Sequence, residues 1–390
     1  MNILQVVSSS RISGAEKHVI VLSDRLRRRG HNVLAVCPRG GWLPEQLRAA
    51  GIPAHEMEMR GSKSLSAGFD LARIVREHGI DLIHAHLTRA TYLGLVAARI
   101  ARRPVVSSVH VRTHDVAYRY LFPPERSQII TVSDFLRERL LQKGVSPSRV
   151  RTIYNGTDFC ADEFSAPSAP PGMAADGASE AGWEGQEEPV ERDGELLPVR
   201  VELSLPPDAE LIGIFARVDE FKGHMILAQA IREVVASRPR AYFLCVGSVE
   251  AKIQRQLWEM AAADGVAERL RFTGVRNDVQ RLMTEMDVVT LPSRYEACSM
   301  SIIEAMALSK PVVATRAGGN PELVTDRETG MLIERNPHAL AQGLIYVLED
   351  AERRQRMGEA ARCCAEARFS ASVMVKQIES LYQEMVAGMI

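Results

Sequence analysis

Two glutamates stand eight positions apart in the stretch SRYEACSMSIIEAMALSKPVVAT, which begins at Ser293. Their neighbours are small, apolar or hydroxylic, and a carboxylate in packed surroundings costs several kcal/mol unless a partner satisfies it. The preceding run DVVTLPS has the pattern of a strand, so Glu296 is predicted on the loop at its C-terminal end. Glu304 then falls in the first turns of the following helix. Both carboxylates are predicted to accept hydrogen bonds from the hydroxyls of a polyol ligand.

Cations that suit a diphosphate follow another strand-like run. In FARVDEFKGH, Arg217 offers a planar fork and Lys222 a point charge, and side chains at this spacing can converge on two phosphates. A solvated pair of charges is the alternative. The helix that begins near Ser299, Met300 and Ser301 would add free backbone amides, which favour an anion. Sugar hydroxyls combined with a diphosphate describe a nucleotide sugar.

Glycines follow two further strand-like runs. Gly14 in SSSRISGAEKH opens a helix and could present backbone N–H groups to a phosphate, while Gly247 ends the strand of CVGS. The chain lacks both G-x-G-x-x-G and G-x-x-x-x-G-K at the first loop, which argues against a dinucleotide or P-loop site. For both glycines, an ordinary structural turn is the alternative to ligand binding.

The elements that must position these residues alternate between short β-rich runs and helical runs, which is typical of parallel βαβ units. The alternation covers 1–158 and resumes over 206–369, with a closing helix at about 370–390 that we expect to pack back on the first part. The acidic segment 159–205 is rich in Pro, Gly, Ser and Ala without apolar periodicity, and is predicted to be a disordered linker. The fold class is therefore α/β, with two doubly wound domains in tandem. Ligands of such sheets bind beyond the C-terminal strand ends, so a cleft between the domains is the expected site.

The charge is unevenly distributed although the chain of 390 residues has a net charge of −1. Residues 1–158 contain 24 Lys and Arg against 13 Asp and Glu, a net of +11, whereas residues 159–200 contain 2 against 10, a net of −8. The basic half suits a phosphorylated glycan or an anionic membrane surface, with solvated helix faces as the alternative. We expect no nucleic-acid partner.

No apolar run approaches the roughly 18 residues of a spanning helix, and the N-terminus lacks the pattern of a secretory signal. The six cysteines form no C-x-x-C pair, which indicates a reducing compartment without structural disulfides or zinc. The chain is expected in the cytoplasm, with association to the inner face of the plasma membrane as a hypothesis.

With these residues in view, the chain resembles the family 4 retaining glycosyltransferases of the GT-B fold group. Glu296 and Glu304 form the E-x7-E pattern of that family, and ARVDEFKG is similar to its R-x4-K phosphate clamp. SGAEKH resembles its GGAE segment, although Ser13 stands where a glycine is more common. HAH, SSVH, VSDFLRERL, IYNGTD and PVVATRAGGNPELV also fit. The likeness covers nearly the whole chain except roughly 159–200, and it implies two Rossmann-like domains that face each other across a cleft.

The resemblance implies a role for each matched residue. Glu296 would contact hydroxyls of the donor sugar, and Glu304 would contact the ribose. Arg217 and Lys222 would neutralise the leaving diphosphate without a metal or other cofactor. The amides near Gly14 would reach the phosphates from the N-terminal domain, which in this fold usually takes the acceptor.

Histidines at strand ends complete the predicted site. His110, at the end of PVVSSVH, would line the sugar pocket near the reacting centre, with a packed or capping histidine as the alternative. For His84 and His86 the favoured interpretation is structural, as rings that satisfy a loop carbonyl. Closure of the cleft is predicted to bring Gly14 and His110 toward Arg217 and Glu296.

The sequence therefore predicts a hexosyltransferase-type enzyme that moves a sugar from a UDP- or GDP-sugar to a glycan or lipid-linked acceptor. Retention of anomeric configuration and a place in cell-surface polysaccharide or lipopolysaccharide assembly follow from the resemblance. Two alternatives stay open, a non-hydrolysing nucleotide-sugar epimerase of the same architecture and a degenerate protein that binds a sugar nucleotide without catalysis.

Overall fold

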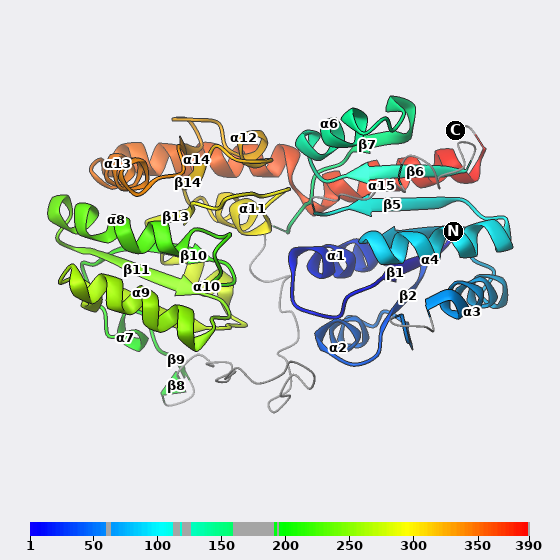
Figure 1. The fold of residues 1–390 in the computed structure, drawn as a ribbon, viewed down its shortest axis with the longest axis horizontal. Helices are drawn as coiled ribbons and strands as arrows, with labels where there is room; N and C mark the ends of the chain where they lie inside the picture. The colour runs from blue at the N-terminus through cyan, green and yellow to red at the C-terminus, as the bar shows by residue number, and fades with distance from the viewer. Residues whose placement is uncertain (60–63, 112–117, 119–125, 159–190, 193–194, 389–390) are drawn as a thin grey trace. The chain divides into compact units, whose positions relative to one another are not determined.

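The computed structural model describes residues 1–59, 64–111, 118, 126–158, 191–192 and 195–388. The chain divides into two compact units, of which unit 1 is Met1–Pro170 with Arg368–Ile390 and unit 2 is Pro171–Ala367 (Figure 1). Most of the linker predicted at 159–205 lies outside the described residues.

Unit 1 is built on a parallel sheet of seven strands in the order β3-β2-β1-β4-β5-β6-β7. The strands are β1 Asn2–Val7, β2 Asn32–Pro38, β3 Ala54–Met57, β4 Leu82–His86, β5 Val105–Val109, β6 Ser127–Thr131 and β7 Val150–Thr152. The described helices are α1 Gly14–Arg28, α2 Trp42–Ala49, α3 Ser64–Glu77, α4 Thr88–Ala101, α6 Asp134–Gln142 and α15 Ala371–Val386.

Both faces of this sheet are covered, which explains why its strands read as nearly continuous apolar runs. Leu4 and Val6 of β1 pack on one face in a core shared with α3 and α4. Ile3 packs on the opposite face in a core shared with α1 and α15. The C-terminal helix α15 thus completes the core of unit 1, where it packs against α1.

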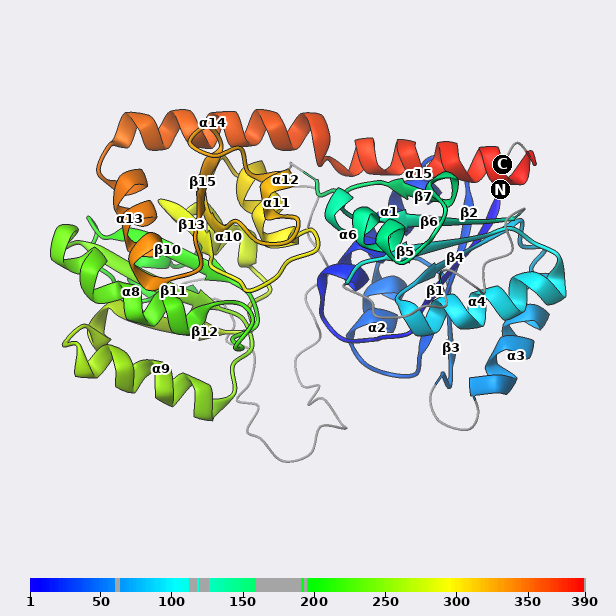
Figure 2. The same ribbon diagram turned by 45° about the horizontal axis from the view of Figure 1, so that its top comes forward.

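Unit 2 contains a parallel sheet of six strands in the order β12-β11-β10-β13-β14-β15. The strands are β10 Glu210–Phe215, β11 Ala241–Val246, β12 Leu270–Gly274, β13 Val288–Leu291, β14 Val312–Thr315 and β15 Gly330–Ile333. The helices are α7 Val199–Glu202, α8 His224–Ser237, α9 Ala251–Ala263, α10 Val279–Thr284, α11 Met300–Ala307, α12 Asn320–Leu323, α13 Pro337–Leu348 and α14 Ala351–Arg368. Helices α8 and α13 lie side by side (Figure 2). Each sheet contains the strand order of a doubly wound Rossmann-like fold, so the predicted α/β fold class is confirmed.

The prediction that the linker is disordered as far as residue 205 is wrong for its last part. Strand β8 Glu191–Arg192 pairs antiparallel with β9 Glu195–Leu196, and helix α7 follows along the chain. The side chain of Glu202 is 3% exposed, and its carboxylate forms an ion pair with Arg276 Nη1 at 2.6 Å. It forms a second ion pair with Arg281. Val199 is also buried, so helix α7 belongs to unit 2 because the charge of Glu202 is neutralised and the apolar side chain of Val199 is covered.

Candidate active site

The strand order of unit 2 reverses between β10 and β13, the position where doubly wound sheets bind ligands. Lys222 lies on the loop after β10, and Glu296 on the loop after β13. Lys222 Nζ donates a hydrogen bond to Glu296 Oε1 at 2.8 Å, with side chains 30% and 9% exposed. The structure therefore brings together a cation and a carboxylate that are 74 positions apart in the sequence.

Asp219 shapes the loop that carries the predicted phosphate clamp. Its Oδ1 accepts hydrogen bonds from the backbone N–H groups of Phe221 and Lys222, both at 2.9 Å. Its Oδ2 accepts from Arg217 Nε and Nη2 at 3.0 and 2.9 Å, and the Arg217 side chain is two-thirds exposed. Sequence reasoning missed Asp219, although an aspartate that accepts from N–H groups two and three residues later is a known turn signal.

Close backbone contacts at two glycines support the same loop. Gly223 has φ +87°, and a Cβ there would lie 2.1 Å from the carbonyl oxygen of Pro292. Gly247 has φ +145°, and a Cβ would lie 2.3 Å from the carbonyl oxygen of Ala216. The absence of a side chain at Gly247 thus allows the end of β11 to pack closely against the backbone of Ala216 and Arg217. The predicted donor contact of Gly247 stays a prediction.

The loop with Glu296 is held by the segment after β14. The Gly319 N–H donates to the Glu296 carbonyl oxygen at 2.9 Å, and Thr315 Oγ1 donates to the Ser293 carbonyl oxygen at 2.6 Å. Gly318, with φ +59°, approaches so closely that a Cβ would lie 2.0 Å from the Glu296 carbonyl oxygen. The backbone of Glu296 is therefore fixed from its own strand and from the neighbouring one.

Helix α11 begins where the sequence predicts. Ser299 is its N-cap, and its Oγ accepts a hydrogen bond from the Ile302 N–H at 3.4 Å. The amides of Met300 and Ser301 point out of the first turn, where an α-helix offers no acceptor of its own. Glu304 is half-buried one turn further along the helix. Their contacts with a donor stay predictions.

In unit 1, Gly14 is the first residue of α1, and Ser13 is its N-cap. Ser13 Oγ accepts from the Ala15 N–H at 3.3 Å and donates to the carboxylate of Glu16, which is 1% exposed. This capping arrangement already places the Glu16 carboxylate at the start of the helix, where the positive end of the helix dipole stabilises a negative charge. The binding of a phosphate near Gly14 stays a prediction.

His110 follows β5 and is 8% exposed. Its Nε2 lies 3.1 Å from Nδ1 of His86, whose Nε2 donates to Gln5 Oε1 at 2.7 Å. His84 contacts Ser108 Oγ through Nε2 at 2.7 Å and the hydroxyl of Tyr382 through Nδ1. The expectation that His84 and His86 satisfy loop carbonyls is wrong, because side chains engage both nitrogens of each ring.

Burial makes these imidazoles neutral. It is the main cause that holds the pKa of His84, His86 and His110 well below the ordinary value, with neighbouring imidazoles as further causes. Burial also lowers the pKa of His18 to about 4, against a hydrogen bond with Asn155 that raises it. Among the described residues, His18, His86 and His110 place ligand atoms within 4.8 Å of one another, which raises the question of a metal ion.

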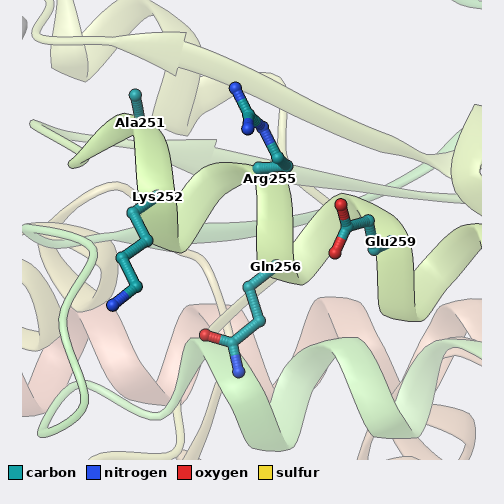
Figure 3. A pocket seen from close by; sticks show the side chains of 5 residues that line it. All are labelled: Ala251, Lys252, Arg255, Gln256 and Glu259. Atoms are coloured by element: carbon teal, nitrogen blue, oxygen red, sulfur yellow. The ribbon is translucent and has the colours of Figure 1, made fainter.

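Two further features of the described residues bear on ligands and membranes. A hollow along α9 is lined by Ala251, Lys252, Arg255, Gln256 and Glu259 (Figure 3). All of these come from one helix and none from a strand end, so we assign no substrate to the hollow. None of the described helices combines the length and the apolar character needed to cross a membrane.

Comparison with known proteins agrees with this geometry. Residues 12–159 match the family described as "Glycosyltransferase Family 4", and residues 209–350 match "Glycosyl transferases group 1". The chain is 32% identical over 196 residues to the D-inositol 3-phosphate glycosyltransferase of Corynebacterium glutamicum, with 48% of this chain and 47% of the relative covered. The match thus spans about half the length of that relative.

Other similarities extend over the whole chain. The phosphatidyl-myo-inositol mannosyltransferase of Mycobacterium tuberculosis is 29% identical over 401 aligned positions, which cover 96% of this chain and 94% of the relative. The crystal structure of Anabaena HepE in complex with UDP superposes with a TM-score of 0.80 at 24% identity and covers 98% of this chain and 100% of its own. The fold class and the predicted resemblance are thus confirmed. The chain belongs to the family 4 glycosyltransferases and has the two parallel-sheet domains of the GT-B fold.

Proposed function

We propose that this glycosyltransferase moves a sugar from a nucleoside diphosphate sugar to a hydroxyl of a phosphate-bearing acceptor, with retention of anomeric configuration. The observation that carries the proposal is the contact of Lys222 Nζ with Glu296 Oε1 at 2.8 Å, at the position where the strand order of unit 2 reverses. A phosphate-binding cation and a hydroxyl-binding carboxylate in contact suit a ligand in which a sugar is joined directly to a diphosphate.

Different side chains bind different parts of the donor. Lys222 and Arg217 neutralise the diphosphate, while the Glu296 carboxylate accepts hydrogen bonds from sugar hydroxyls. Glu304 accepts hydrogen bonds from the ribose. The amides of Met300 and Ser301 bind a phosphate oxygen, because an N-terminal helix turn favours negative charge.

The reaction exchanges one carbon–oxygen bond for another. The acceptor oxygen bonds to the anomeric carbon as the bond from that carbon to the β-phosphate oxygen breaks. The acceptor's hydroxyl proton leaves with the nucleoside diphosphate, whose developing charge is stabilised by Lys222 and Arg217 in place of a metal. Transfer is therefore expected to continue in excess EDTA, and loss of transfer that Mg²⁺ restores would contradict this part of the proposal.

The acceptor is proposed to be an inositol phosphate or an inositol phospholipid. Two relatives have names that specify inositol phosphate and phosphatidylinositol substrates, and the net charge of +11 over residues 1–158 suits such an anion. A lipid-borne acceptor places the enzyme at the inner face of the plasma membrane and in cell-surface glycoconjugate synthesis. A polysaccharide or lipopolysaccharide acceptor is the other outcome of an acceptor screen.

The donor is identified first, by thermal shift with UDP, GDP, ADP and their sugars. A ligand present at 100 times its Kd stabilises the native state by about 2.7 kcal/mol, which is readily measured. We expect a UDP- or GDP-sugar to raise the melting temperature of the wild-type protein but not of Lys222→Met.

Lys252→Met is the matched control, because it removes an exposed lysine from α9 in the same unit. It should respond to the donor as the wild-type protein does. Equal stabilisation of the wild-type protein and Lys222→Met would contradict the donor site, and loss of stabilisation in Lys252→Met alone would move the site to the hollow along α9.

A further inference from the structure

A chain of buried polar side chains connects the C-terminal helix α15 to His110 in unit 1. The members come from α15, three neighbouring strands of the sheet and the residue after β5 (Figure 1). They are Gln5, His84, His86, Ser108 and Tyr382, each 0% exposed, together with His110 at 8%. Polar groups this deep are costly unless every hydrogen bond is made, so their donors and acceptors can be assigned in turn.

The direction of the hydrogen bonds follows from Gln5. Its Oε1 can only accept, so the 2.7 Å contact requires that His86 Nε2 carries a proton. A neutral imidazole has one proton, so His86 Nδ1 is an acceptor. The 3.1 Å contact is then a bond from His110 Nε2–H to His86 Nδ1. His110 Nδ1 is left as a bare acceptor.

Tyr382 determines which end of the Gln5 amide faces His86. Burial raises the pKa of the Tyr382 phenol, so the hydroxyl keeps its single proton. Gln5 Nε2 donates a hydrogen bond to the Tyr382 hydroxyl oxygen at 3.5 Å, and the same hydroxyl contacts His84 Nδ1. Gln5 must then present its oxygen to His86.

We propose that Gln5 and Tyr382 are positioning residues that hold His110 in its Nε2–H tautomer, with Nδ1 free to accept a hydrogen bond from a substrate hydroxyl. The inference rests on the proposed function, because the hydroxyl belongs to a substrate of that transfer reaction. His110 Nδ1 is buried and has no hydrogen-bond partner among the described residues. A buried acceptor of this kind needs a partner, and a hydroxyl of the bound sugar or acceptor supplies one.

A metal ion at His18, His86 and His110 explains the same cluster less well. Both nitrogens of His86 are already used, one as donor to Gln5 and the other as acceptor from His110. A metal would have to displace the bond to His110. The ligand atoms are also spread over as much as 4.8 Å, whereas ions such as zinc need bonds of about 2.0–2.1 Å to each nitrogen.

The direct test is the protonation state of each ring nitrogen in the whole protein labelled with ¹⁵N-histidine. Long-range proton–nitrogen correlation spectra distinguish a protonated ring nitrogen from a bare one, and His110→Gln identifies the His110 signals among the ten histidines. In the wild-type protein near pH 7.5, His86 and His110 should both be protonated only at Nε2.

Gln5→Leu should give mixed tautomers at both rings, because it removes the acceptor for His86 Nε2. Tyr382→Phe is the milder variant, since it removes only the hydroxyl, and it should produce the same mixing by releasing the Gln5 amide. Gln128→Leu is the matched control, because Gln128 is also a buried glutamine on a strand of this sheet. That control should leave both spectra unchanged.

Kinetics provide the second readout. Gln5→Leu and Tyr382→Phe should lower kcat about 10-fold, with the KM for the donor within about twofold of the wild-type value. Protonation of His110 at Nδ1 in the wild-type protein, or unchanged tautomers in both variants, would overturn the inference. Failure to transfer any sugar would instead contradict the proposed function, since the spectra require no turnover.

Discussion

Replacing Gly318 with alanine is expected to damage the active site far more than the fold. Gly318 has φ +59°, in the left-handed region, and its position places a Cβ 2.0 Å from the carbonyl oxygen of Glu296. Because real Cβ atoms do not approach a backbone oxygen within 3.0 Å, one of the two segments must move by 1.0 Å or more. Movement of either segment disturbs the support of Glu296, whose carbonyl oxygen also accepts the Gly319 N–H at 2.9 Å.

The size of the effect follows from that displacement. A shift of about 1 Å in a substrate-positioning group costs on the order of 100-fold in rate, which corresponds to about 2.7 kcal/mol of transition-state stabilisation. The left-handed conformation costs an alanine a further ~1–2 kcal/mol of folding stability. Gly318→Ala should therefore fold, with kcat/KM about 100-fold below the wild-type value.

Gly265→Ala separates the two contributions. Gly265 has φ +72° in the same unit, and a Cβ there would have no heavy atom within 4 Å. Both variants should lose a similar amount of stability in urea unfolding followed by circular dichroism, but Gly265→Ala should keep wild-type transfer kinetics. If kcat/KM of Gly318→Ala lies within about threefold of that of Gly265→Ala, the claim that this glycine holds Glu296 in place is wrong.

Three further predictions follow from the same contacts. Lys222→Met should lower kcat by about 10²- to 10³-fold in steady-state transfer assays while circular dichroism shows an intact fold, because it removes charge stabilisation of the leaving diphosphate; a loss below tenfold would contradict its role. Arg276→Ala should lower the free energy of unfolding of unit 2, measured in urea, by about 3–5 kcal/mol. The reason is that the variant leaves the buried Glu202 carboxylate with only one of its two cations. A change below about 1 kcal/mol would contradict a structural role for this pair. His18 has a pKa of about 4 in the folded protein and about 6.5 in the unfolded chain, so the unfolded state binds more protons between these values and stability falls as the pH drops from about 6.5 toward 4. His18 therefore lowers the free energy of unfolding by about 1.4 kcal/mol at pH 5.5 relative to its value near pH 7.5. In His18→Phe, the free energy of unfolding in urea should fall correspondingly less between pH 7.5 and 5.5.

The sequence predicts the parts of this molecule that depend on local pattern. Alternating strands and helices give both sheets, because each βαβ unit is encoded in a continuous stretch of chain. The start of α11 at Ser299 was also predictable, since a serine before an apolar helical run is an N-cap signal. The placement of Lys222 and Glu296 at the same edge of the sheet follows from the rule that ligand-binding residues gather at C-terminal strand ends, whereas their direct contact is a finding of the structure.

Other features depend on contacts between distant segments and carry no local signal. Tyr382 lies 298 positions after His84, and its hydroxyl finds that ring only once α15 has packed on unit 1. In the sequence, Gly318 is one of two adjacent glycines with the pattern of a loop, and only the structure shows that it lies against the carbonyl oxygen of Glu296. Glu202 reads as one more acid in a polar linker, yet it is buried against Arg276. In each case the tertiary partner, and not the residue's own neighbours, determines its role.

The central claim is tested most directly by a single-turnover transfer assay. It combines the donor identified by thermal shift with a phosphatidylinositol acceptor, and the product's anomeric configuration is determined by NMR. The wild-type protein should form a glycoside with the same anomeric configuration as the donor, and Lys222→Met and Glu296→Ala should each form it at least 100-fold more slowly. Wild-type rates in both variants, or a product of inverted configuration, would contradict the account.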